Sequence, residues 1–144
     1  MKNGRTGQNQ IAVIAALCCI ALFSGCGGAS YRDGTYTGKS GEDDTGAWGE
    51  VSVVITGGRI TGCTFVTWQK DGSVKDEDYG KIHGEISNRP FYDSAQLAVR
   101  AMEKYAGDLA RTGKLEEVEA VSGATIAWNQ FNEAVMNALA AAKK

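Results

Sequence analysis

The chain has few of the residues from which metal and redox centres are commonly built. It contains one histidine, His83, with no second histidine or paired cysteine at ligand spacing. No Cys-x-x-Cys-His motif is present, which excludes covalent attachment of c-type haem. There is no block of basic residues and the net charge is −2, so the composition does not point to nucleic acid. The sequence therefore predicts no catalytic residue, no metal site and no nucleic-acid partner.

No apolar run is long enough to cross a bilayer. The longest one, residues 11–23, has thirteen residues, whereas a membrane-spanning helix needs about 20. It follows Lys2 and Arg5, and a basic start before a short apolar run is typical of a secretory signal peptide. The next residues, Leu22-Phe23-Ser24-Gly25-Cys26, resemble a bacterial lipobox, in which the cysteine is lipidated and becomes the mature N-terminus. The alternative is an ordinary signal peptide, with Cys26 a free thiol.

These features predict a membrane-anchored protein with one domain. We expect a lipoprotein signal peptide over residues 1–25, the lipidated Cys26 and a tether over residues 26–32, and the domain over residues 33–144. The domain would then face the extracytoplasmic side of the cell membrane. If Cys26 is lipidated, Cys63 is the last thiol, so no internal disulfide can stabilise the fold. We expect Cys63 to be a small buried apolar residue.

Alternation of apolar and polar residues predicts a small β-meander. Residues 33–39 and 48–56 are expected to be strands, the second with Val51, Val53 and Ile55 on one face. Gly57-Gly58 is a hairpin signal, and residues 59–68 would form the returning strand.

Helical periodicity then appears twice. The first helix is expected to open at Asp93, with Gln96 completing a capping box, and to end at Thr112 before Gly113. Residues 114–121 are expected to be a short strand-like run, with a final helix starting near Ile126 and carrying its apolar residues in register: Phe131, Ala134, Val135, Ala138, Leu139 and Ala142. The predicted fold class is α+β, a small antiparallel sheet packed against two helices.

The junction before the final helix has an unusual composition. Ser122, Gly123, Ala124 and Thr125 bring two hydroxyls and two of the smallest residues together at a helix start. Small residues leave the backbone uncovered, and the unpaired N–H groups of a helix N-terminus favour an anion such as phosphate. The same residues also suit an ordinary N-cap and turn. By chance, a given sequence of four residues is expected on the order of once in a few hundred chains of this length.

With Glu119 before it, Ser122-Gly123-Ala124-Thr125 resembles the motif of the FMN-binding domain family: an acidic residue, two spacers, Ser or Thr, then Gly-Ala-Thr. Members include the flavin-bearing subunits of sodium-pumping quinone reductases and many small exported flavoproteins. The resemblance implies FMN joined to Thr125 by a phosphodiester and installed by a flavin transferase that uses FAD with magnesium. Most members have Asp where this chain has Glu119, which keeps the charge and extends the reach.

Trp128 lies one helical turn after Thr125, so it could belong to the core or flank the isoalloxazine ring. The favoured function is a membrane-anchored electron carrier rather than a complete enzyme, served by redox partner proteins or a quinone-linked donor. The alternative is a lipid-anchored module that binds a small molecule or a protein and has no redox role.

Overall fold

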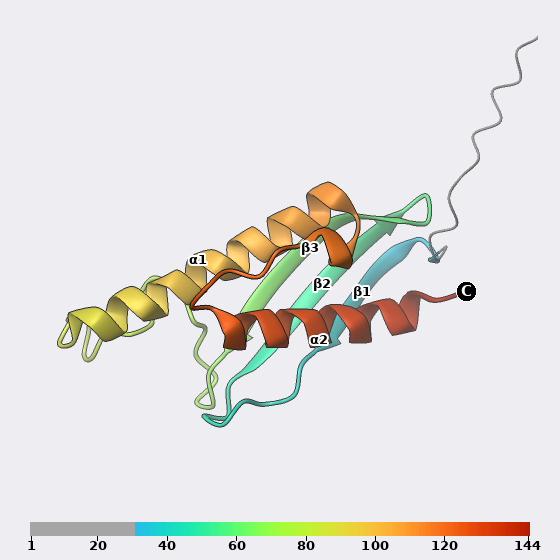
Figure 1. The fold of residues 1–144 in the computed structure, drawn as a ribbon. Helices are drawn as coiled ribbons and strands as arrows, with labels where there is room; N and C mark the ends of the chain where they lie inside the picture. Colours follow the sequence, from blue (N-terminus) through green and yellow to red (C-terminus); the bar gives the residue numbers. More distant parts are fainter. Residues whose placement is uncertain (1–30) are drawn as a thin grey trace, which may run out of the picture.

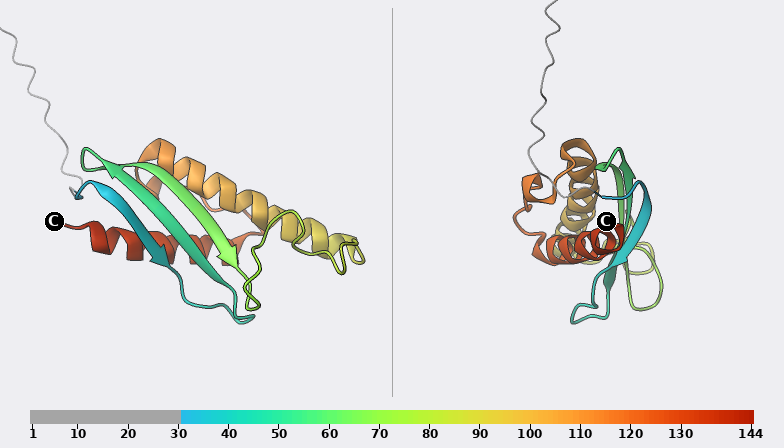
Figure 2. Two further views of the ribbon diagram at one scale, coloured as in Figure 1. Left: turned by 180° about the vertical axis from the view of Figure 1, so that it is seen from behind. Right: turned by 90° about the vertical axis from the view of Figure 1, so that its right-hand side faces the viewer.

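The computed structural model describes residues 31–144 and shows two layers (Figures 1 and 2). Three antiparallel strands form one layer in the order β1-β2-β3, and two helices, α1 and α2, lie together on one face of this sheet. The fold is therefore α+β with a β-meander, as the sequence predicts. The signal peptide, Cys26 and most of the tether lie outside the described residues. Within residues 31–144, no helix is long and apolar enough to cross a membrane.

The strands are β1 (Gly34–Lys39), β2 (Trp48–Thr56) and β3 (Arg59–Trp68). Val51, Val53 and Ile55 of β2 face the helices and are buried, which confirms the predicted alternation. Gly57 and Gly58 have φ values of 62° and 74°, the left-handed conformation that a tight hairpin requires. Cys63 of β3 is only half-buried against the core, although burial still raises the pKa of its thiol to about 12.

Helix α1 (Arg89–Thr112) begins one turn earlier than the predicted start at Asp93, so the predicted capping box is wrong. Asn88 is the N-cap, and its side chain accepts a hydrogen bond from the Phe91 N–H at 3.1 Å. Pro90 fits the first turn, because N–H groups there have no partner within the helix and proline has no N–H to leave unpaired. Gly113 ends the helix in the left-handed conformation, as predicted.

The predicted strand-like run over residues 114–121 is also wrong. The structure has a short 3₁₀ helix, η1 (Leu115–Glu117), followed by extended chain. The apolar residues Leu115, Val118 and Val121 are three apart, the period of a 3₁₀ helix rather than of a strand. All three pack against the core, so the segment covers the helices without joining the sheet.

Helix α2 (Thr125–Ala142) lies across β1 and β2 and brings the predicted apolar residues into the core. Its close approach to β1 depends on Gly38, where a Cβ atom would overlap the Ala134 carbonyl oxygen and the Ala138 nitrogen. The far end of α2 lies beside the start of the described chain, since the Arg32 N–H donates to the Ala142 carbonyl at 2.9 Å. Thr125 therefore stands at the opposite end of α2 from the point where the N-terminal segment joins (Figure 1).

Candidate functional site

The Ser-Gly-Ala-Thr motif, residues 122–125, forms a tight turn that leads into α2. The Ala124 N–H donates to the Val121 carbonyl at 3.0 Å, and Gly123 between them has φ +85°. A Cβ atom on Gly123 would also lie 2.9 Å from Leu97 Cδ2 of α1. The left-handed backbone favours glycine here, and a larger residue would also displace the Leu97 side chain.

A buried tyrosine holds this turn in place. Tyr105 of α1 is fully buried, and its hydroxyl oxygen accepts a hydrogen bond from the Val121 N–H at 2.9 Å. Its ring packs edge-on against Trp128, with centroids 5.2 Å apart, and against Phe131. The turn is thus fixed to α1 on one side and to α2 on the other.

The motif residues differ in exposure. Thr125 is the first residue of α2, and Ser122, Thr125 and Glu119 are all exposed, whereas Ala124 is buried. The first backbone hydrogen bond of α2 runs from the Trp128 N–H to the Ala124 carbonyl. The N–H groups of Thr125, Ile126 and Ala127 precede it and have no partner within the helix. Glu119 takes part in no hydrogen bond or ion pair among residues 31–144.

A cavity of about 280 Å³ opens beside Thr125, between the two helices and the end of β3. Its lining is mainly apolar, with a few polar groups, and its volume is near the lower end of the range typical of small-molecule sites. Gly123, Ala124 and Thr125 contribute one wall, from the motif itself. The cavity is also lined by Thr67, Lys75, Met102 and Gln130.

Trp128 does not line this cavity. It is half-buried and packs on Tyr105 and on Phe131, whose ring centroid is 6.1 Å away. Of the two roles that the sequence leaves open for Trp128, this placement favours packing against the core.

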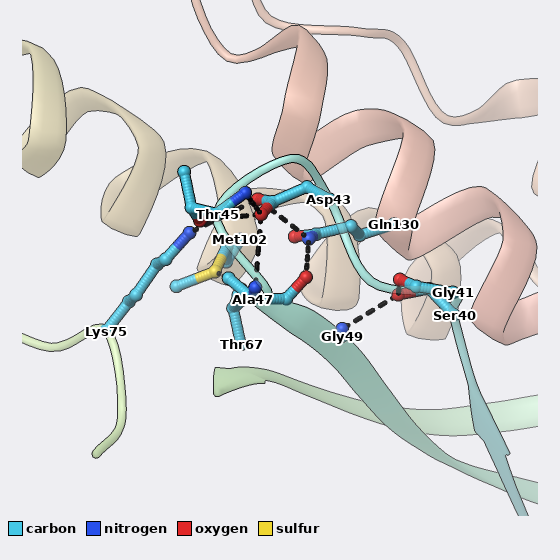
Figure 3. A network of polar contacts seen from close by, with 10 residues as sticks. All are labelled: Ser40, Gly41, Asp43, Thr45, Ala47, Gly49, Thr67, Lys75, Met102 and Gln130. Carbon is cyan, nitrogen blue, oxygen red and sulfur yellow. Dashed lines mark hydrogen bonds and ion pairs between the residues drawn. The ribbon is translucent and has the colours of Figure 1, made fainter. Parts of the chain in front are cut away.

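The polar end of the cavity is a network drawn in Figure 3. Gln130 is 5% exposed, and its Nε2 donates to the Ala47 carbonyl at 2.9 Å and to Asp43 Oδ2 at 3.3 Å. Asp43 Oδ1 in turn accepts hydrogen bonds from Thr45 and from the Ala47 N–H. Because both partners of Nε2 can only accept, the orientation of the amide is fixed and Oε1 faces away from them. Gln130 Oε1 is buried and has no hydrogen-bond partner in the part of the chain that the structure describes.

Lys75 brings a positive charge to the same cavity. Its backbone N–H donates to the Thr67 carbonyl at 2.9 Å, which holds it beside the end of β3. Its Nζ lies 3.9 Å from Asp43 Oδ2 and 5.0 Å from the centroid of the Tyr79 ring. Burial lowers the pKa of Lys75, and the Asp43 carboxylate opposes this only in part.

Sequence reasoning missed Asp43, Lys75 and Gln130. One signal was present for Gln130, since it interrupts the apolar stripe of α2 between Ala127 and Phe131, where a buried polar residue needs a reason. Asp43 and Lys75 occur in polar stretches that resemble ordinary loops, and only the fold brings them together.

These residues fit a flavin. The exposed hydroxyl of Thr125 and the unpaired N–H groups of α2 suit a phosphate, and the mainly apolar cavity suits a planar ring. Gln130 Oε1 is an unsatisfied buried acceptor, which costs free energy unless a ligand donates to it. The site thus offers a phosphate end and a ring end with one polar edge.

Comparisons with known proteins agree. A family model for the FMN-binding domain matches residues 46–140. The chain is 28% identical over 120 residues to the 15 kDa lipoprotein of Treponema pallidum (strain Nichols), covering 81% of this chain and 79% of that protein. Its fold is similar to the crystal structure of the CPE2226 protein from Clostridium perfringens, with a TM-score of 0.60, 20% identity, and coverage of 78% of this chain and 88% of that one. The chain belongs to the FMN-binding domain family and is a flavin-binding protein.

Proposed function

We propose that this protein is an electron carrier that holds FMN through a phosphodiester bond to the Thr125 hydroxyl. The observation that carries the proposal is the position of Thr125, exposed at the first residue of α2 and at the wall of the cavity. A phosphate on its oxygen would lie beside the N–H groups of residues 125–127, at the positive end of the helix dipole. When bound, the flavin supplies the electron-transfer chemistry.

The chain's own residues provide binding and orientation. Gly123 leaves the backbone uncovered, and Tyr105 fixes the turn, so the Thr125 hydroxyl is presented at one defined place. The mainly apolar cavity excludes water from one side of a ring. Neither Ser122 nor Glu119 lines the cavity, so we assign Ser122 to support of the phosphate or the turn, and Glu119 to recognition by the flavin transferase.

Maturation outside the cell gives covalent attachment a physical purpose. A cofactor that dissociates into a large dilute volume is lost by mass action, whereas a covalent bond keeps it at any dilution. We assign the attachment to a flavin transferase that draws FMN from FAD with magnesium. Cys26 would carry the lipid that keeps the protein at the cell membrane.

The geometry of α2 bears on the choice of redox partner. Thr125 and Lys143 are at opposite ends of this helix, about 27 Å apart at 1.5 Å per residue. The N-terminal segment joins beside Lys143, through the bridge between Tyr31 and Lys143. An anchor at Cys26 would hold the molecule by the end away from the flavin, which favours an exchange of electrons with a partner protein over direct contact with a quinone inside the bilayer.

The proposal is tested by expressing the chain in a host with and without the flavin transferase. We expect yellow protein only with the transferase, and flavin fluorescence that stays with the polypeptide after denaturing electrophoresis. Colourless protein from the host with the transferase would instead favour the alternative function, a lipid-anchored binding module with no redox role.

A further inference from the structure

Two polar groups of the cavity lining make no hydrogen bond with residues 31–144. The first is Gln130 Oε1, a buried acceptor without a partner in this part of the chain. Lys75 Nζ makes no hydrogen bond among the described residues, since its only polar contact is the ion pair with Asp43 at 3.9 Å. Its side chain is nevertheless only 12% exposed. Gln130 and Lys75 both line this cavity, so a ligand there would meet an acceptor without a partner and a cation.

Hydrogen bonds hold the Gln130 amide in one orientation. The Gln130 amide is held by the Ala47 carbonyl and by Asp43, and Asp43 is held by Thr45. If the amide were flipped, Oε1 would face the two oxygen atoms that now accept from Nε2, and an acceptor would meet acceptors. The backbone of Lys75 is hydrogen-bonded to Thr67. The fixed amide therefore selects a ligand by the placement of its donor, and Lys75 adds a positive charge to the same lining.

This pattern is complementary to an imide. The pyrimidine edge of an isoalloxazine ring carries an N–H, at N3, between two carbonyl groups. We propose that Gln130 Oε1 accepts from N3–H and that the Lys75 ammonium faces the neighbouring C2 carbonyl and N1, so that Lys75 sets the reduction potential of the flavin. This inference rests on the proposed flavin at Thr125 and names the residues that recognise its ring.

The position along α2 is consistent with this. Gln130 is five residues after Thr125, about 7.5 Å along the helix axis, with the phosphate at one end and the ring edge at the other. The ribityl chain and the width of the ring would lie between these two groups. Both Thr125 and Gln130 line the same cavity.

Electrostatics gives Lys75 its effect. Two-electron reduction of the ring with uptake of one proton at N5 leaves a negative charge over N1 and the C2 carbonyl. A cation beside these atoms stabilises the reduced ring more than the neutral oxidised ring, and the low polarity of the cavity strengthens the attraction. The reduced ring would also offset the burial that lowers the pKa of Lys75, which Asp43 alone does not.

The test begins with intact mass, which shows whether each variant carries the FMN adduct. Lys75→Met removes the charge and keeps the length, Lys75→Arg keeps the charge, and Lys39→Met removes an exposed charge at the outer face of the sheet. Potentials are read against an indicator dye while dithionite supplies the two electrons and is oxidised to sulfite. We expect Lys75→Met to lose at least tenfold in preference for the reduced ring, about 30 mV for a two-electron couple, and the other two variants to stay near wild type. Equal potentials for Lys75→Met and Lys39→Met would overturn the role of Lys75.

The contact of Gln130 is tested by hydrogen exchange, in the wild-type chain and in Gln130→Met. In protein loaded with ¹⁵N-labelled flavin, the N3–H proton should give an NMR signal that exchanges with water at least tenfold more slowly than in free FMN, and Gln130→Met should abolish this protection. Exchange at the rate of free FMN in the wild-type protein would overturn the contact.

A wild-type chain without an adduct contradicts the proposed function rather than the ring site. The same potentials and exchange rates are then measured with free FMN added to the same variants. A chain that neither carries nor binds FMN contradicts both proposals.

Discussion

The Tyr105 hydroxyl oxygen accepts a hydrogen bond from the Val121 N–H at 2.9 Å, and this bond joins the motif turn to the middle of α1. Tyr105 is 0% exposed, and it is far from the motif in sequence. A helix that shows no sign of function in the sequence therefore determines where Thr125 lies.

Tyr105→Phe keeps the ring and leaves the Val121 N–H without its partner. We expect the free energy of unfolding to fall by about 1–3 kcal/mol, and the yield of flavin attachment to fall because the turn is less fixed. Urea unfolding and intact mass measure the two effects. Tyr36→Phe is the control, since the Tyr36 hydroxyl only makes a 3.5 Å contact at an exposed position. Equal stability of the two variants would contradict a structural role for the Tyr105 hydroxyl.

Gly38 and Gly107 should respond to alanine in opposite directions. At Gly38 the new Cβ would meet the backbone of α2 at Ala134 and Ala138, so Gly38→Ala should destabilise the protein by about 1–3 kcal/mol or more. Gly107 is inside α1, where a Cβ meets nothing within 4 Å, and Gly107→Ala should stabilise by about 0.5–1 kcal/mol. Thermal unfolding compares them. A Gly38→Ala variant as stable as wild type would mean that α2 does not pack this closely on β1.

The Asp43 network predicts a dependence of stability on pH. Burial raises the pKa of the Asp43 carboxyl, but hydrogen bonds from Thr45 and Ala47 outweigh it, so the pKa in the folded state lies below its usual value of about 3.9. The stabilisation is complete above that value and is lost as the pH falls through the folded-state pKa. Asp43→Asn should therefore lose less stability than wild type as the pH falls below about 4. Urea unfolding at several pH values tests this, with the exposed neighbour Asp44→Asn as the control. The same acid dependence in wild type and Asp43→Asn would contradict it.

Local patterns predicted most of the fold. The three strands follow from alternation, the hairpin from Gly57-Gly58, and the core face of α2 from its apolar spacing, since each depends on neighbours in sequence. Two elements differ from the prediction, the start of α1 and residues 114–121. At the first an acidic capping box competes with Asn88 and Pro90, and at the second a period of three resembles a short strand.

The site was predicted only in part. The motif residues were visible because they are adjacent in sequence. The polar network at the cavity was not, since Asp43, Lys75 and Gln130 come from three distant segments and meet only in the folded chain. The hydrogen bond of Tyr105 to the motif depends on the geometry of the turn, which no local pattern in the sequence shows.

The lipid anchor is tested at Cys26, which lies outside the described residues. Wild-type protein should fractionate with membranes, and Cys26→Ala should either release it or leave the signal peptide uncleaved. One acyl chain gives only marginal binding, so mass spectrometry of the mature N-terminus should find at least two. Wild-type protein found entirely in the medium would contradict the anchor.

The proposed bond between Thr125 and FMN is tested directly by intact-protein mass spectrometry after coexpression with the flavin transferase. Thr125→Val keeps the shape of the side chain and removes the only oxygen assigned to the ester. Ser122→Ala removes the neighbouring hydroxyl. We expect an FMN-sized adduct on wild type and on Ser122→Ala, and none on a folded Thr125→Val. An adduct that persists on Thr125→Val, or one that Ser122→Ala alone abolishes, would contradict it.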